Sequence, residues 1–211
     1  MGKKVVLEVS KKINPTTLLI TNPEVNLDID AKKVHITKQI MNKIAGINTT
    51  EEVAALFPMP DEKPLSNEKS ILVIDQVSDP GNLGTLFRSA LALNFNAVVL
   101  IQGTVDPLND KAIRASKGAC LLLPFCHETE NSFYQLVKEK KITAYLADME
   151  GTDIKKVKFK IPYALILSNE AKGKRAWPKD FINISIPMNK DVESLNVATS
   201  GSILIYVMKN G

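Results

Sequence analysis

The chain has 211 residues, of which 45% are hydrophobic and 24% charged, and its 27 basic and 23 acidic side chains give a net charge of +4. This composition excludes wholesale disorder, collagen-like repeats and a coiled coil. The longest apolar runs, such as 97–101 and 163–167, fall far short of the roughly 18 residues that a membrane span needs. We therefore expect no membrane partner, while the small positive charge permits a nucleic-acid partner without requiring one.

Histidine and cysteine are too scarce for several kinds of site. The only histidines are His35 and His127, and the only cysteines, Cys120 and Cys126, lie in the apolar run CLLLPFC. A histidine-based triad or a two-histidine metal site is hard to build from these, so no metal is expected. The cysteines are predicted to be buried reduced thiols. Because the first residues also lack a signal-peptide pattern, we expect a cytoplasmic protein.

The first sixty residues predict a small α/β module. Its expected elements are a helix at 3–12, strands at 16–21 and 34–37, a helix at 38–44 that ends at Gly46, and a strand at 51–58. The module begins abruptly and is short, which is the pattern of an incomplete module. Residues 58–69 contain three prolines and several charges, which favour a linker. We therefore expect a module at 1–60, a linker at 61–69 and a second domain at 70–211.

The second domain alternates apolar strands with helices. The predicted strands are 71–75, 97–101, 120–125, 142–147, 164–167 and 182–186, and the predicted helices are 83–94, 110–116, 132–140 and 195–208. Near-continuous apolar strands between helices are typical of a parallel sheet that is covered on both faces. The predicted fold class is therefore α/β with a parallel sheet.

Three polar, glycine-containing loops follow predicted strands, at 75–90, 168–173 and 186–201. Ligands bind at the carboxyl edge of open α/β sheets, so we expect the three loops to form one site. Taken alone, the first loop could bind phosphate at a helix N-terminus, although it matches neither the dinucleotide nor the P-loop pattern. Asn82 could equally be a helix N-cap, and Arg88 a partner in a surface ion pair.

Together, the three loops resemble the three signature motifs of the SpoU group of the SPOUT RNA methyltransferases. The first motif is similar to DxVxDPxNxGxxxR[ST]A, here DQVSDPGNLGTLFRSA at 75–90. The second motif is LSNEAKG at 167–173, and the third is IPM followed by ESLNVATSG at 193–201. The resemblance covers about residues 71–208, and RASKGACLLLPF at 114–125 is similar to the family's stretch between the first two motifs.

The resemblance implies a fold, a cofactor and partners. The implied fold is a parallel sheet whose C-terminal segment makes a deep trefoil knot, preceded here by a small module similar to a ribosomal-protein-like RNA-binding domain. The implied activity is 2′-O-ribose methylation of ribosomal or transfer RNA by a homodimer that uses S-adenosyl-L-methionine. The alternative is a non-catalytic RNA-binding dimer that retains the knot.

The resemblance also assigns residues. The catalytic set would be Asn82, Arg88, Glu170, Ser194 and Asn196. The cofactor would be held around Leu167, Ser168, Glu170, Gly173, Ile186, Met188, Leu195 and Ala198. Arg88 could take the ribose proton or clamp a phosphate, and because arginine is normally always protonated the clamp is the simpler role. For Ser194, capping of the last helix and contact with the substrate are both open.

Two residues depart from the family pattern. Ser168 stands where the second motif usually has glycine, so a side chain is expected close to the cofactor, and we expect cofactor binding to survive this change. Asn94 replaces a common glycine at the end of the first helix, where asparagine can also adopt the left-handed conformation.

Overall fold

The computed structural model describes residues 2–46, 48, 51–168, 177–189 and 191–210. The chain divides into two compact units, residues 1–61 and 62–211, and each is described by itself. The elements of the first unit are α1 (Lys3–Ser10), β1 (Thr17–Ile20), β2 (Lys32–His35), α2 (Lys38–Ala45) and β3 (Val53–Leu56).

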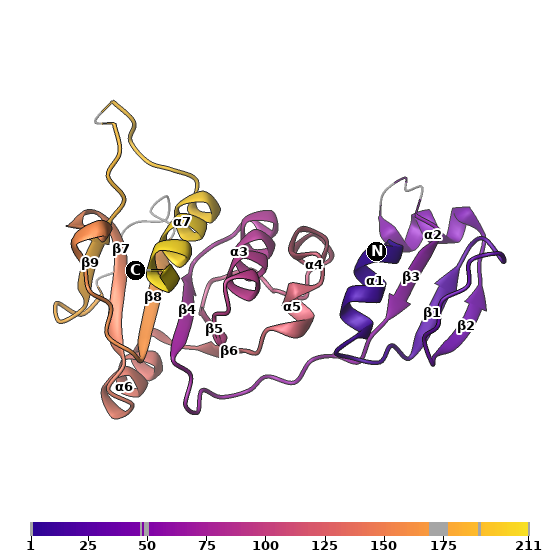
Figure 1. Cartoon of the computed structure of the whole chain (residues 1–211), viewed down its shortest axis with the longest axis horizontal. Coiled ribbons are helices and arrows are strands. Elements are labelled where there is room, and N and C mark those ends of the chain that lie inside the picture. The colour runs from indigo at the N-terminus through magenta and orange to yellow at the C-terminus, as the bar shows by residue number, and fades with distance from the viewer. Residues whose placement is uncertain (1, 47, 49–50, 169–176, 190, 211) are drawn as a thin grey trace. The chain divides into compact units, whose positions relative to one another are not determined.

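The first unit is a three-stranded sheet with the order β2-β1-β3, in which β1 pairs parallel to β2 and antiparallel to β3 (Figure 1). Its core is small and consists of Val6, Leu18, Ile20, Leu27 and Val53. The helix predicted to end at Gly46 does so, because this glycine adopts the left-handed conformation that closes α2.

The second unit is built on a six-stranded sheet with the order β6-β5-β4-β8-β7-β9, and every described pair in it is parallel (Figure 1). Its strands are β4 (Ser70–Asp75), β5 (Ala97–Ile101), β6 (Phe125–Glu128), β7 (Thr143–Asp153), β8 (Tyr163–Ser168) and β9 (Ile182–Ser185). Its helices are α3 (Pro80–Ala92), α4 (Asp110–Ser116), α5 (Ala119–Leu122), α6 (Glu130–Glu139) and α7 (Val197–Asn210), with a 3-10 turn, η1, at Ile154–Lys156. The predicted parallel-sheet α/β fold is confirmed.

Both faces of this sheet are covered, and successive strand residues alternate between them. Leu72 and Ile74 of β4 pack into the core beneath α3, α5 and α7, whereas Ile71 and Val73 pack into a second core with Phe133 of α6. Because side chains alternate along a strand and both sides are apolar, the strands show the near-continuous hydrophobic runs seen in the sequence.

The strand predicted at 120–125 is wrong. Residues 119–122 form the short helix α5 instead, which follows a left-handed Gly118, and β6 begins only at Phe125. The run is apolar because Ala119, Cys120 and Leu123 pack into the core beneath α3, and a short apolar run has no periodicity that distinguishes strand from helix.

Three helix starts also differ from the sequence prediction, and the helix predicted from residue 132 begins at Glu130. The helix predicted from residue 83 begins at Pro80, where the missing amide hydrogen of proline costs no hydrogen bond, and Asp79 rather than Asn82 is its N-cap. The last helix begins at Val197 rather than residue 195.

Asn94 ends α3 in the left-handed conformation, with φ 57°. The amides of Asn94 and Phe95 donate to the carbonyls of Leu91 and Ala90, respectively, at 3.2 and 2.9 Å. These two hydrogen bonds form a Schellman motif, so asparagine performs here the task that glycine usually performs.

Part of the proline-rich stretch packs on the second unit. Glu62 accepts a hydrogen bond from the His127 amide at 3.1 Å and pairs with its Nδ1 at 2.8 Å, while Leu65 is buried against the second core.

Both cysteines are buried, as predicted. Burial raises the pKa of Cys120 and of Cys126 to about 11, which leaves the thiols protonated and unreactive at neutral pH. Among the described residues, no helix is long and apolar enough to cross a membrane.

Candidate functional site

A cavity of about 460 Å³ lies at the carboxyl edge of the six-stranded sheet. Four segments line it: the loop after β4 with the start of α3, the middle of β7, the end of β8, and the stretch from β9 into α7. The lining residues are Val77, Ser78, Asp79, Asn82, Ala147, Asp148, Met149, Leu167, Ser168, Ile184, Ser185, Ile186, Met188, Ser194, Leu195, Asn196, Val197, Ser200 and Leu204. The described parts of all three motif-bearing segments therefore reach one site, as predicted for the ligand edge of such a sheet.

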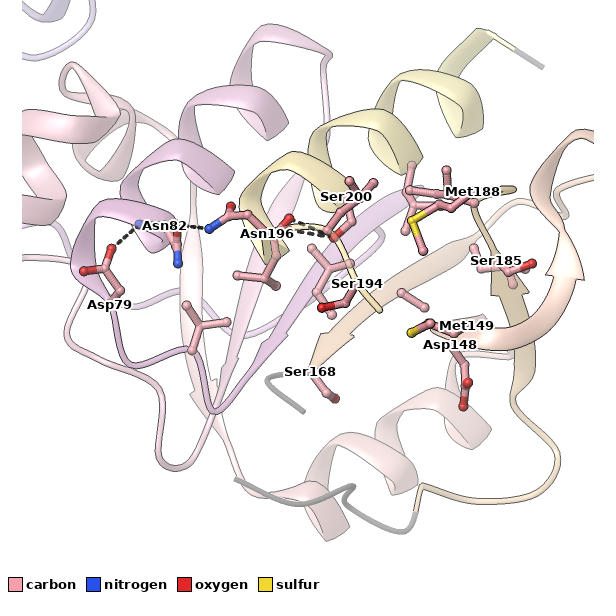
Figure 2. Close-up of a pocket in the computed structure, with 18 of the residues that line it drawn as sticks. Asp79, Asn82, Asp148, Met149, Ser168, Ser185, Met188, Ser194, Asn196 and Ser200 are labelled. Carbon is pink, nitrogen blue, oxygen red and sulfur yellow. Dashed lines mark hydrogen bonds between the residues drawn. The ribbon is translucent and has the colours of Figure 1, made fainter. Parts of the chain in front are cut away.

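Asn82 and Asn196 connect the N-termini of two helices at the cavity wall. Nδ2 of Asn196 donates to Oδ1 of Asn82 at 3.1 Å (Figure 2). Oδ1 of Asn196 accepts from the amides of Ala198 and Thr199. Asn196 is thus the N-cap of α7, and the alternative that Ser194 caps this helix is wrong. Nδ2 of Asn82 has no partner among the described residues, so it remains a donor for a ligand.

Asp79 contacts both Asn82 and Lys111 at the start of α3. Its Oδ1 accepts from the Asn82 amide at 2.8 Å, and its Oδ2 pairs with Nζ of Lys111 on α4 at 2.7 Å. The Lys111 ammonium and then the Asn82 amide lower the pKa of Asp79 below its usual 3.8, because both favour the charged carboxylate. Asp79 therefore fixes the start of α3, and with it the position of Asn82.

Asp79→Ala is expected to lower the free energy of unfolding by about 1 kcal/mol at pH 7, because it removes the helix cap. A carboxylate whose pKa is depressed by folding stabilises the protein above its unfolded pKa of 3.8, and this contribution disappears as the pH falls through the folded pKa. Urea unfolding at pH 7 and pH 3 should therefore show a smaller difference between wild type and variant at pH 3. Asp79→Asn, which still caps, is the control and should cost less at pH 7; an equal difference at both pH values would contradict the prediction.

The cavity contains most of the residues assigned by resemblance to the cofactor. Leu167, Ser168, Ile186, Met188 and Leu195 all line it. Ala198 is buried within α7 and does not line it. Glu170 and Gly173 lie outside the described residues.

Only some of the residues assigned to catalysis lie at the cavity. Asn82, Ser194 and Asn196 line the cavity, whereas Arg88 lies on the exposed side of α3 and does not. No described carboxylate forms an ion pair with Arg88, so the alternative of a surface ion-pair partner finds no support in the described part of the chain. Its guanidinium is accessible to a partner in solution.

Sequence reasoning missed the contribution of β7. Asp148 and Met149 line the cavity from the middle of this strand, opposite Asn82, and Ser185 of β9 lies beside them (Figure 2). The strand predicted at 142–147 runs on to Asp153, and the polar residues DMEG that follow the apolar stretch were the available signal, because they follow the part of β7 that pairs with β8.

Ser168 lines the cavity as expected, but its hydroxyl is held by protein groups. Its Oγ donates to Oδ2 of Asp75 at 3.0 Å and accepts from Nε1 of Trp177 at 3.2 Å. The side chain that replaces the usual glycine therefore belongs to a hydrogen-bonded network in the wall.

Known proteins resemble the chain in sequence and in fold. Residues 69–206 match the model of the SpoU rRNA Methylase family. The chain is 33% identical to the 23S rRNA (guanosine(2553)-2'-O)-methyltransferase RlmP of Bacillus subtilis (strain 168) over 177 residues, which are 82% of this chain and 71% of that protein.

Two solved structures share the fold. The SpoU methyltransferase AviRb from Streptomyces viridochromogenes, in complex with the cofactor AdoMet, superposes with a TM-score of 0.85 at 23% identity over 100% of this chain and 88% of that one. An AdoMet-bound rRNA methyltransferase from Sinorhizobium meliloti gives a TM-score of 0.83 at 21% identity over 99% and 85%. With the family match over 69–206, the chain belongs to the SpoU rRNA methylase family.

Proposed function

We propose that the chain transfers a methyl group from S-adenosyl-L-methionine to a ribose 2′-hydroxyl of ribosomal or transfer RNA. The observation that carries the proposal is the convergence of the first and third family motifs, and of the described start of the second, Leu167 and Ser168, on one cavity at the carboxyl edge of the sheet. The similarity to a 23S rRNA 2'-O-methyltransferase and to AdoMet-bound structures supports the same reaction and cofactor.

The cavity suits the cofactor in size and chemistry. Its volume of about 460 Å³ lies in the range of small-molecule sites, and it combines apolar residues with a few polar groups. An apolar surface for adenine is formed by Leu167, Ile186, Met188 and Leu195. When bound, S-adenosyl-L-methionine supplies the methyl group on a sulfonium, and the protein supplies orientation.

The residues around the cavity can each perform a part of the reaction. In-line displacement requires alignment of the 2′-hydroxyl, exclusion of water and acceptance of the hydroxyl proton. Asn82 is positioned by Asp79 and Asn196 and offers its Nδ2 donor to the ribose. Arg88 would bind the target phosphate and stabilise negative charge developing on the oxygen, and the role of proton acceptor stays open beside it.

The RNA partner is supported by a lysine strip, defined as Lys155, Lys156, Lys158 and Lys160. All four side chains are exposed, and none forms an ion pair with a described carboxylate. In the extended part of the strip, the intervening Val157 and Phe159 pack into the core and so keep the lysines on the solvent side. Unpaired cations are suited to phosphate contacts. We also assign RNA selection to the first unit.

The proposal includes a homodimer, the trefoil knot and a cytoplasmic location. Ile203 and Tyr206 of α7 are 37% and 58% exposed, and a second copy of the chain would cover this apolar pair.

The knot is supported by the path of the chain, which leaves β9 at the edge of the sheet and returns to pack α7 against α3 and β8. A cytoplasmic location follows from the proposed RNA substrates, and no metal is needed for the reaction.

Incubation of the purified protein with methyl-deuterated S-adenosyl-L-methionine and unmodified total RNA tests the proposal. After nuclease digestion, mass spectrometry should detect a deuterated 2′-O-methylnucleoside. Label on a base would overturn the ribose assignment but keep the cofactor. No label, together with intact cofactor binding, would favour the non-catalytic RNA-binding dimer.

A further inference from the structure

Ser168 and Asp75 occupy equivalent positions at the carboxyl edge of the sheet. They are the last residues of β8 and β4, and the parallel register pairs them directly. Asp75 is only 1% exposed, and Ser168 donates a hydrogen bond to its Oδ2 at 3.0 Å. A hydrogen bond between buried groups is stronger than one in water, so this contact fixes the rotamer of Ser168.

Trp177 holds Ser168 from the other side. Its indole is 8% exposed, lies edge-on to Phe133 of α6 and stacks on Phe181, with ring centroids 6.2 and 5.7 Å away. The indole has one hydrogen-bond donor, which is directed at Oγ of Ser168 at 3.2 Å. The aromatic packing therefore determines where this donor lies, and a buried indole N–H without a partner would be costly.

We propose that Ser168 is a positioning residue of the cofactor site, held in place by Trp177 and Asp75. Its hydroxyl receives one hydrogen bond and donates the other to protein groups, so the side chain is held in the wall of the cavity that it lines together with Leu167. The packing of the aromatic cluster on one face of the sheet therefore affects the shape of the cavity at the carboxyl edge of the sheet. The inference rests on the proposed function only in taking S-adenosyl-L-methionine as the ligand.

A double-mutant cycle tests the coupling. Ser168→Ala keeps Cβ and removes the hydroxyl, while Trp177→Phe keeps an aromatic ring and removes the donor. Calorimetry on the full chain without RNA should show S-adenosyl-L-methionine binding weakened about 5- to 10-fold by each change, because the loosened wall must then be ordered when the cofactor binds. The double variant should bind no more weakly than the weaker single variant, because both changes break the same contact. The kcat at saturating cofactor should stay within about twofold of wild type, so the effect appears in binding.

Tyr134→Phe is the matched control. Its ring packs on Phe181 in the same aromatic cluster, 6.0 Å between centroids, but no hydrogen bond links it to Ser168 in the described structure. Its cofactor affinity should equal that of wild type. Lower melting temperatures with unchanged affinity in both single variants, or single effects that multiply in the double variant, would overturn the inference while leaving the proposed function intact. Failure of the wild type to bind the cofactor would overturn both.

Discussion

Arg88→Ala is expected to lower kcat/KM for RNA methylation by about 100- to 1,000-fold, the usual effect of removing one group that stabilises developing negative charge. The guanidinium lies on the exposed side of α3, six residues after Asn82, where it can reach a phosphate or ribose of bound RNA. Because Arg88 does not line the cavity, the dissociation constant for S-adenosyl-L-methionine should stay within about twofold of wild type. Single-turnover kinetics with labelled cofactor and calorimetry measure the two quantities.

Two further variants separate the possible roles of Arg88. Arg88→Lys keeps the charge but loses the planar, two-pronged donor, so it should recover only part of the lost rate if the residue clamps a phosphate. Lys138→Ala removes an exposed cation from α6, beside the Tyr134 ring, and controls for a general loss of charge; it should methylate at the wild-type rate. Equal losses in Arg88→Ala and Lys138→Ala would show that Arg88 has no specific role.

Gly84→Ala is expected to lower the free energy of unfolding by about 2–3 kcal/mol, the range for overpacking of a close contact. A Cβ at this position would lie 2.4 Å from the carbonyl oxygen of Ala112 and 2.8 Å from the amide nitrogen of Ser116. Both are backbone atoms of the α4 segment, so relief requires the two segments to move apart. Urea unfolding followed by circular dichroism gives the change in stability.

Thr85→Ala is the control for Gly84→Ala. It changes the next residue of α3, which is exposed and loses only a hydrogen bond from its hydroxyl to the Gly81 carbonyl. Its stability should stay within about 0.5 kcal/mol of wild type, as for most surface substitutions. If Gly84→Ala were as stable as this control, the close approach of α3 to α4 would not constrain the fold.

The fold could largely be predicted because both faces of the sheet are apolar. The strands at 71–75 and 97–101 are short runs bounded by polar residues, and they lie in the structure where the pattern places them. The exception was 120–125, where the same apolar composition forms α5 and a following turn. Hydrophobicity indicates burial, but it does not determine which backbone conformation delivers the side chains to the core.

The sequence motifs predicted which residues belong to the site, but not how their side chains are arranged. The identities of Asn82 and Asn196 suggested a polar site, yet the cap of α3 is Asp79 and Asn196 caps α7. Asp148 was missed because β7 carries no signature motif in this sequence. Its contribution depends on the order of strands in the sheet, which the chain reveals only when folded.

The sequence by itself determined the family, the parallel sheet and the three segments that approach the ligand edge, because these depend on residue type and local spacing. Only the tertiary structure decided that the hydroxyl of Ser168 is held between Asp75 and Trp177, and that Asn82 is joined to Asn196. Asp75 is 93 residues from Ser168, and the two asparagines are 114 residues apart. Contacts over such separations are set by strand order and helix packing, which no local pattern encodes.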